Sequence, residues 1–148
     1  KREWANTSDL FQREGGYMCI ADSDGTTLAV KRVRLVKQEK REKYSAYAPE
    51  KTGRLGRHPN HILSSQSRNP NLEQWGGAVR GDKYLWGFSG LTEELDEVAM
   101  IGVAFAYGDL SWEEVDKLLW NHYPLLSHVF VRKLKNMSET KFEYGHIL

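Results

Sequence analysis

The stretch WGGAVRGDKYLWGFSGLTEELDEVA, residues 75–99, carries strand, turn and helix signals in immediate succession. The run GGAVR and the aromatic run YLWGF flank a Gly-Asp pair, which predicts a β-hairpin with its turn at that pair. Thr92 then precedes a burst of acidic residues and predicts the N-cap of a helix. Glu93 and Glu94 fall in its first turn, where the helix dipole favours negative charge. A hairpin followed directly by a capped helix indicates a domain of the mixed α+β class.

The helix predicted after Thr92 is apolar around much of its circumference. Apolar or small residues repeat at helical spacing and the other positions of MIGVAFA are apolar too, so we expect burial on more than one side. The repeating residues are Leu91, Leu95, Val98, Gly102 and Phe105. We interpret Glu93, Glu94 and Glu97 as helix-start and solvent-face residues. No acid/base pair stands out, so the catalytic residues stay unknown and no enzymatic activity is predicted.

The glycines of this stretch do not form a phosphate-binding loop. Neither G-x-x-x-x-G-K-[ST] nor G-x-G-x-x-G occurs here. Gly90 stands close to the helix start, but the two glutamates after Thr92 occupy that positive end and repel a phosphate. The nucleophile-elbow pattern G-x-S-x-G also fails, because Leu91 stands where it requires glycine. Ser89 therefore reads as a turn residue.

Upstream, YMCIADSDGTTLAVKRVRLV, residues 17–36, gives the clearest hairpin signal in the chain, with two β-prone runs around a DSDG turn. The apolar alternation slips between Leu28/Val30 and Val33/Leu35, which predicts a bulge or the end of the strand near Lys31.

Helical patterns flank this hairpin. Trp4, Ser8 and Phe11 lie on one face of a short predicted helix near the start of the sequence. Residues 39–55 are compatible with a helix but contain Pro49 and Gly53, which predict two short helices or a broken one. Residues 56–74, rich in Gly, Pro, Asn and Ser, predict a loop.

The order of these motifs resembles the GlcG/HbpS-like ("haem-degrading") domain family, also found at the C-terminus of PduO. In that family a GG-containing strand leads to G-x-S-G-x-T-x-x-x-D-E-x-x-A and a helix. The first hairpin, IADSDGTTLAVKR, is similar to the family's, and EKTGRLGR lies where the family's helix carries a Lys followed by a small residue or Thr. The resemblance spans roughly residues 4–107. The matching positions are Gly76, Gly77, Gly87, Ser89, Gly90, Thr92, Asp96 and Glu97, and Ala99 lies one position before the alanine of the pattern.

The resemblance implies an α+β fold with a central antiparallel sheet of about five strands flanked by helices, over a domain of residues 1–110. It implies a small-ligand-binding protein that assembles as a homo-oligomer, with haem or a related tetrapyrrole as the candidate ligand. It also makes Lys51, Thr52 and Ser89 candidate ligand-binding residues.

His58 and His61 are the remaining candidates, in the sequence HPNH within the predicted loop. The two imidazoles are close enough in sequence to share a ligand. Solvated loop histidines are the alternative, because no Cys or carboxylate lies nearby in sequence to complete a tetrahedral metal site, and no metal site is predicted.

Charge is unevenly distributed although the net charge is +1. Residues 31–43, KRVRLVKQEKREK, carry seven basic and two acidic side chains, whereas residues 92–116 carry eight acidic side chains and no Lys or Arg. This polarity suits an anionic ligand or docking between copies of the chain. The alternative function is nucleic-acid binding, or a purely structural interaction, by the basic segment beside Tyr44 and Tyr47; the modest pI and the interleaved glutamates count against nucleic acid.

Two further features concern location and assembly. No apolar run approaches the roughly 20 residues that cross a bilayer, so no membrane partner is expected. The single cysteine, Cys19, and the lack of a signal-peptide pattern at the start predict a cytoplasmic protein.

Residues 111–148 form a predicted C-terminal extension, mainly helical, that packs on the same domain or on a neighbouring subunit. Ser111 to Glu114 make a capping box, followed by a stripe of Trp112, Val115, Leu118 and Leu119 that Pro124 ends. The period of LLSHVFVRKLK does not decide between a second helix and an added strand.

Overall fold

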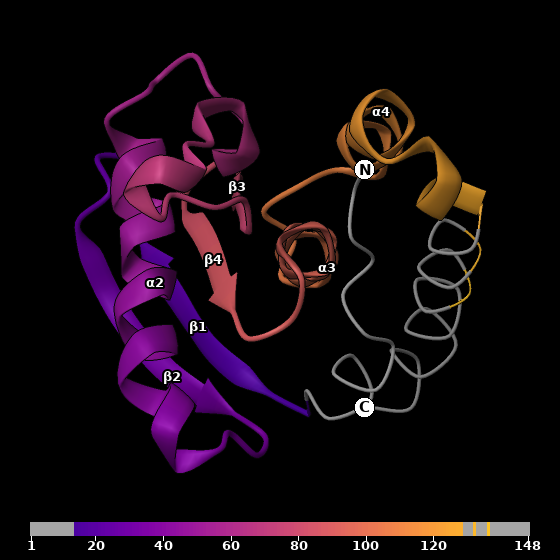
Figure 1. Cartoon of the computed structure of the whole chain (residues 1–148). Helices are drawn as coiled ribbons and strands as arrows, with labels where there is room; N and C mark the ends of the chain where they lie inside the picture. Colours follow the sequence, from indigo (N-terminus) through magenta and orange to yellow (C-terminus); the bar gives the residue numbers. More distant parts are fainter. Residues whose placement is uncertain (1–13, 129–131, 133–135, 137–148) are drawn as a thin grey trace, which may run out of the picture. The chain divides into compact units, whose positions relative to one another are not determined.

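The computed structural model describes residues 14–128, 132 and 136, and the chain divides into two compact units, Lys1–Asp109 and Leu110–Leu148. The first unit contains an antiparallel sheet and helices, which confirms the predicted α+β class (Figure 1). Its elements are β1 (Gly16–Ala21), β2 (Thr27–Val33), α2 (Gln38–Gly56), the 3₁₀ turns η1 (Ser64–Ser67) and η2 (Pro70–Leu72), β3 (Ala78–Arg80), β4 (Leu85–Ser89) and α3 (Glu93–Ala106). The second unit contains α4 (Trp112–His122).

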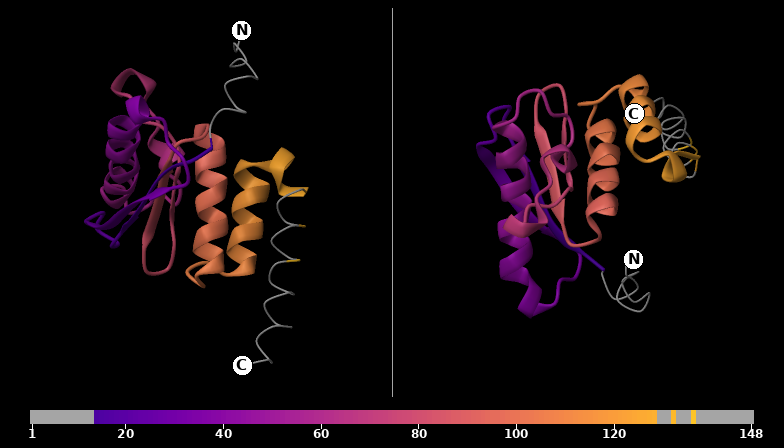
Figure 2. Two further views of the ribbon diagram at one scale, coloured as in Figure 1. Left: turned by 90° about the horizontal axis from the view of Figure 1, so that it is seen from below. Right: turned by 45° about the horizontal axis from the view of Figure 1, so that its top comes forward.

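The sheet has the strand order β2-β1-β4-β3 and lies between two helices. Helix α2 covers one face and α3 lies on the other (Figure 2). The described residues form four strands, so the expected count of about five was too high. Leu63, just before η1, makes only an isolated bridge with Val79, because the chain turns into the 3₁₀ helix at the next residue.

The first hairpin is confirmed, and of the two alternatives near Lys31 the structure shows the end of the strand, at Val33, and no bulge. The pairing of β1 with β2 is continuous from Gly16↔Val33 through Met18↔Lys31 to Ile20↔Ala29, and shifts only next to the turn, where Ala21 pairs with Thr27. Strand β2 lies at the sheet edge with nearly every residue exposed. Since neither of its faces is deeply buried, no strict alternation is required, and the slip near Lys31 did not signal a bulge.

Helix α2 is a single helix, so the prediction of a broken helix was wrong. Pro49 lies inside it, and there it removes only one backbone donor from a helix of 19 residues. Gly56 is needed for packing rather than for breaking the helix. A Cβ at Gly56 would lie 2.5 Å from the Cα of Gly25, in the turn of the first hairpin. The turn and the end of the helix can therefore approach each other closely only because both residues are glycine.

The second hairpin, β3–β4, is confirmed and is closed by a carboxylate. Asp109 accepts hydrogen bonds from the amides of Lys83 (2.8 Å) and Tyr84 (3.0 Å) and from Trp86 Nε1 (2.8 Å). Asp109 is itself buried, so it joins the hairpin turn to the residues that follow α3. On the α2 side of the sheet, Ala21, Leu55, Ala78 and Leu85 form a buried apolar cluster.

Helix α3 begins as predicted, but a different face is buried. Thr92 is the N-cap, and its hydroxyl accepts from the Leu95 amide (3.4 Å). Of the five residues in the predicted stripe only Val98 is buried, and Leu95 is 39% exposed. The buried face instead contains Asp96, Glu97, Met100, Ile101 and Ala104. Glu97 is fully buried, so its assignment to the solvent face was wrong; the partners that stabilise this carboxylate come from a distant loop.

In the second unit, the predicted capping box of α4 is confirmed. The Ser111 amide donates to Glu114 Oε2 (2.6 Å), and the Glu114 amide donates to Ser111 Oγ (3.2 Å). Val115, Leu118 and Leu119 are buried, and residues 124–128 are helical. The later part of LLSHVFVRKLK and the helix predicted over Trp4 to Phe11 lie outside the described residues. Within the described part of the chain, no helix combines the length and the apolar character that crossing a membrane requires.

Candidate ligand-binding site

Lys51, one of the predicted ligand-binding residues, is buried in an ion pair. Its ammonium lies 3.0 Å from Asp96 Oδ2 and donates to the carbonyl of Phe88 at 2.8 Å. Gly77 lies against this ammonium, since a Cβ there would be 2.6 Å from Lys51 Nζ. The pair therefore connects α2, the end of β4 and the start of α3 inside the fold.

The pKa of Asp96 shows that burying this ion pair carries a desolvation cost in free energy. Burial raises the pKa of the Asp96 carboxyl above its ordinary value of 3.8, and the Lys51 ammonium and the amides of Leu91 and Gly90 oppose part of the rise. The Leu91 amide donates to Asp96 Oδ1 at 2.8 Å. A buried carboxylate with a lysine and backbone donors is compensated, and this arrangement serves the fold.

Thr52 and Ser89 are also inside the fold. The Thr52 hydroxyl donates to the carbonyl of Pro49 (3.1 Å) and lies 3.3 Å from Cys19 Sγ. Ser89 is the last residue of β4 and is 3% exposed. The structure therefore places Lys51, Thr52 and Ser89 away from solvent, where a ligand arriving from solution would have to displace packed protein.

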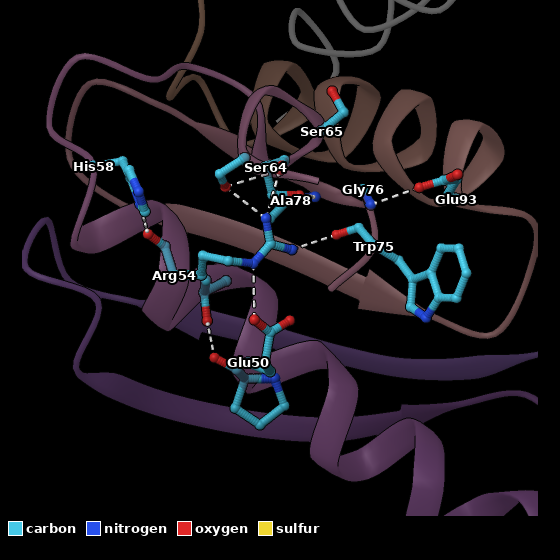
Figure 3. A network of polar contacts seen from close by, with 12 residues as sticks. Glu50, Arg54, His58, Ser64, Ser65, Trp75, Gly76, Ala78 and Glu93 are labelled. Carbon is cyan, nitrogen blue, oxygen red and sulfur yellow. Dashed lines mark hydrogen bonds and ion pairs between the residues drawn. The ribbon is translucent and has the colours of Figure 1, made fainter. Parts of the chain in front are cut away.

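Arg54, one helical turn after Lys51, holds the loop that follows α2 (Figure 3). Its guanidinium is buried and donates to Glu50 Oε1 (2.8 Å), to the Ser64 carbonyl (2.7 Å) and to Ser67 Oγ (2.6 Å). It also donates to the carbonyl of Trp75. One side chain thus fastens both ends of the segment 64–75 to α2, using the fork of donors that only arginine supplies.

Glu97 fastens the same loop from the opposite side. Its carboxylate accepts from the hydroxyls of Ser65 (2.6 Å) and Ser64 (3.3 Å), and from the amides of Ser65 (3.1 Å) and Gly77 (3.0 Å). Glu93, one turn earlier, accepts from the Gly76 amide (2.8 Å) and pairs with Arg68 (2.7 Å). The loop is therefore fixed by internal charges at both of its flanks, whereas its composition predicted only that it is a loop.

Sequence reasoning missed this network. The signal was available in part, because Ser64, Ser65, Gly76 and Gly77 are small residues that leave amide and hydroxyl donors open to a carboxylate. Nothing in a single sequence indicates that Glu97 and Arg54, 43 positions apart, hold opposite sides of that loop.

Arg80 at the end of β3 fixes the segment that carries the two candidate histidines. Its guanidinium donates to the carbonyls of His61 (2.9 Å), Leu55 (2.6 Å) and His58 (3.2 Å). These carbonyls lie at and beyond the end of α2, where helix geometry leaves acceptors unsatisfied. The turn from His58 to His61, here called the histidine turn, is closed by a hydrogen bond from the His61 amide to the His58 carbonyl (2.9 Å).

The structure brings the two predicted histidines together as a stacked pair. Their ring centroids are 4.8 Å apart and the planes differ by 9°. His58 Nδ1 lies 2.8 Å from the Arg54 carbonyl, which can only accept, so Nδ1 carries the proton and Nε2 of the neutral ring has a free lone pair. His61 Nδ1 is buried without a hydrogen-bond partner among the described residues. Leaving such an atom unpaired costs about 1–3 kcal/mol, so His61 has unused bonding capacity.

The donors at the histidine turn suit some ligands better than others. The described residues contain no group of three or more His, Cys, Asp or Glu that could hold a metal ion, so a closed metal site with four protein ligands is not supported there. A tetrapyrrole brings four nitrogen donors of its own and needs only an axial side chain, commonly a histidine. His58, oriented through Nδ1, fits that role, because a hydrogen bond at the other ring nitrogen typically orients ligating histidines.

Comparison with known proteins adds nothing to this geometry: no protein-family model, curated protein or solved structure matches the chain.

Proposed function

We propose that this domain binds a small metal-bearing ligand, haem or a related tetrapyrrole, at the histidine turn, with His58 Nε2 as the axial ligand. The observation that carries the proposal is the hydrogen bond between His58 Nδ1 and the Arg54 carbonyl. It leaves the lone pair on Nε2 and restrains the ring, which reduces the entropy that a free side chain loses on binding.

The surroundings of the turn support the same ligand. Ile62, the next residue after His61, is 46% exposed and offers apolar surface to a macrocycle. Arg57 is exposed just before His58 and can pair with the ligand's carboxylates. Behind the turn, Arg80 and Arg54 hold the backbone through several carbonyls, so the histidine is presented from a fixed support.

The test is a hemin titration of the full chain followed by its Soret absorbance. Wild-type protein should give a saturable shift with one site per chain. His58→Ala should weaken binding about tenfold or more, since an axial bond is worth at least the 1.4 kcal/mol of one decade. Added imidazole should restore the ligated spectrum in this variant.

His122→Ala is the matched control, because His122 is an exposed histidine in the second unit. It should titrate like the wild type. A wild-type protein without a saturable shift, or a His58→Ala variant with unchanged affinity and spectrum, would contradict the proposal.

We also propose that the protein forms a homo-oligomer. The outer edge of β2 is unpaired within the described sheet, and its Leu28 and Val30 are 57% and 41% exposed. Such an edge is a template for pairing with another strand. Sedimentation velocity should show a species larger than the monomer, and Val30→Asp should shift it toward the monomer; a wild-type protein that sediments as a monomer at high concentration contradicts this part.

Nucleic-acid binding by residues 31–43 is the weaker alternative. Single-stranded nucleic acid rewards exposed aromatic rings beside basic charge. Tyr44 and Tyr47 are only partly exposed, and the Tyr47 ring is covered by the Lys43 ammonium, 5.2 Å from its centroid. The exposed apolar side chain within the basic segment is Leu35, an aliphatic group that cannot stack on bases.

A further inference from the structure

The basic segment 31–43 forms one exposed region, here called the basic tip, that runs from the end of β2 through the β2–α2 connection into the first turns of α2 (Figure 1). All of its basic side chains are exposed. They are Lys31, Arg32, Arg34, Lys37, Lys40, Arg41 and Lys43. Two glutamates, Glu39 and Glu42, are interleaved, so the tip keeps a local charge of +5 from seven positive and two negative groups.

An exposed leucine lies in the middle of these charges. Leu35 is 74% exposed, while Val36 beside it is 7% exposed, and the Val36 carbonyl accepts from Arg41 Nε (3.1 Å). Arg34 adopts a left-handed backbone conformation with φ of 60°, which is uncommon for a residue other than glycine. The β2–α2 connection is therefore held by a hydrogen bond just after Leu35 and turns sharply just before it. Leu35 is exposed on a loop of defined conformation.

Part of the positive charge of the tip has no ion-pair partner among the described residues. Lys31, Arg32, Arg34 and Lys40 form no ion pair with a described residue. The acidic residues at the start of α3 offer little charge to another copy, because Asp96 and Glu97 are buried and Glu93 pairs with Arg68. The uncompensated charge calls for an external polyanion.

We propose that the basic tip docks on an anionic lipid bilayer, with the cations against the headgroups and Leu35 inserted at the boundary of the acyl chains. Clusters of four to eight basic residues bind anionic membranes through such contacts, and an exposed aliphatic group adds affinity by burial in the interface. An aliphatic side chain does not stack on bases, which favours lipid over nucleic acid. The protein then lies on the surface, and no membrane-spanning segment is required.

The test is co-sedimentation of the full chain with vesicles of 70% phosphatidylcholine and 30% phosphatidylserine, compared with pure phosphatidylcholine, at low and physiological salt. Wild-type protein should bind only the anionic vesicles, and less at high salt. The triple variant Arg32→Gln/Arg34→Gln/Lys40→Gln should bind about a hundredfold more weakly, since each basic residue near the surface contributes about one decade or slightly less. Leu35→Ser should reduce binding about fivefold, because it removes an inserted apolar group.

Two matched variants control for general changes in charge and apolar surface. Leu72→Ser alters another exposed leucine, 65% exposed, and Lys83→Gln removes an exposed lysine outside the tip. Both should bind like the wild type. The proposal is overturned if wild-type protein does not sediment with anionic vesicles at low salt, or if the triple variant sediments equally well. Binding of an RNA oligonucleotide that depends on the three cations but not on Leu35, without vesicle binding, also overturns it in favour of nucleic acid.

Discussion

The basic tip and the acidic residues of α3 carry opposite charge in sequence, and they differ even more in how the fold uses that charge. Every basic side chain of residues 31–43 is exposed. Of the five acidic residues between positions 93 and 109, Asp96, Glu97 and Asp109 are buried and Glu93 is paired with Arg68. Only Glu94 is exposed and takes part in none of these contacts.

The unequal burial of acidic and basic side chains gives a nearly neutral chain a polarised surface. The acidic residues are used inside, where they accept hydrogen bonds from Lys51, from loop amides and from serine hydroxyls. Lys31, Arg32, Arg34 and Lys40 of the tip form no ion pair with a described residue, so their charge is available for binding. Formal charge counted from sequence therefore overestimates the negative surface that residues 93–109 present.

Removing the ammonium that compensates Asp96 should have the largest effect on stability. Lys51→Met leaves the Asp96 carboxylate buried without its cation, and breaking a buried ion pair in this way costs about 3 kcal/mol or more. Urea denaturation at neutral pH measures the loss. Glu94→Gln, on the exposed side of the helix turn that carries Asp96, should change the free energy of unfolding by no more than about 0.5 kcal/mol. If the two substitutions changed the free energy of unfolding equally, the distinction between the buried Asp96 and the exposed Glu94 would fail.

The same carboxyl gives a pH test. Because burial raises the pKa of Asp96 above 3.8, the folded protein takes up this proton at a higher pH than the unfolded chain does. The contribution of this group to the free energy of unfolding should therefore increase as the pH falls from the raised pKa toward 3.8. As the pH falls from the raised pKa toward 3.8, the free energy of unfolding of the wild type should increase relative to that of Asp96→Asn. Urea denaturation at several pH values in the acid range measures both, and a relative decrease contradicts the assignment.

Glu97→Gln should have a somewhat smaller effect, about 2 kcal/mol, because the amide keeps the shape but presents one acceptor oxygen and two donors to a site built of donors. Hydrogen exchange adds a local readout. The amides of Ser65 and Gly77 should lose protection, while those of β1 paired with β4 should change only with global stability. Unchanged protection at both loop amides would show that Glu97 does not hold the loop.

Neutralising a basic residue of the tip should have the smallest effect. Lys40 lies in the first turn of α2, where the helix dipole disfavours positive charge, so Lys40→Gln should be neutral or stabilise the protein by about 0.3 kcal/mol. Thermal or urea unfolding measures this. A loss above about 1 kcal/mol would indicate that the tip has an internal structural partner and would weaken the contrast with α3.

Local signals in the sequence predicted much of the fold. The DSDG turn, the Thr92 N-cap and the Ser111–Glu114 capping box each depend on residues a few positions apart, and the structure contains all of them. The continuity of α2 and the burial of Glu97 were not predicted, because they depend on packing between distant segments. Gly56 meets Gly25, and Glu97 meets a loop that begins 33 positions earlier.

At the candidate site, too, local sequence predicted some features and only the structure shows the others. The spacing of His58 and His61 left open a shared ligand or two solvated loop histidines, and the structure shows that the rings are stacked. The tautomer of His58 depends on the Arg54 carbonyl and on the end of α2, which only the structure shows. Lys51, Thr52 and Ser89 came from the family resemblance, and the contacts of all three are internal.

The most direct test of the central claim, that the fold presents His58 with Nε2 ready to ligate, is side-chain nitrogen NMR of the free protein at about pH 8, where an ordinary histidine is neutral. Two-bond correlations of ¹⁵N-labelled protein, assigned with His58→Ala, distinguish protonated from unprotonated ring nitrogens. We predict a proton on Nδ1 and a bare Nε2 at His58. A proton on Nε2 with Nδ1 unprotonated would contradict the account.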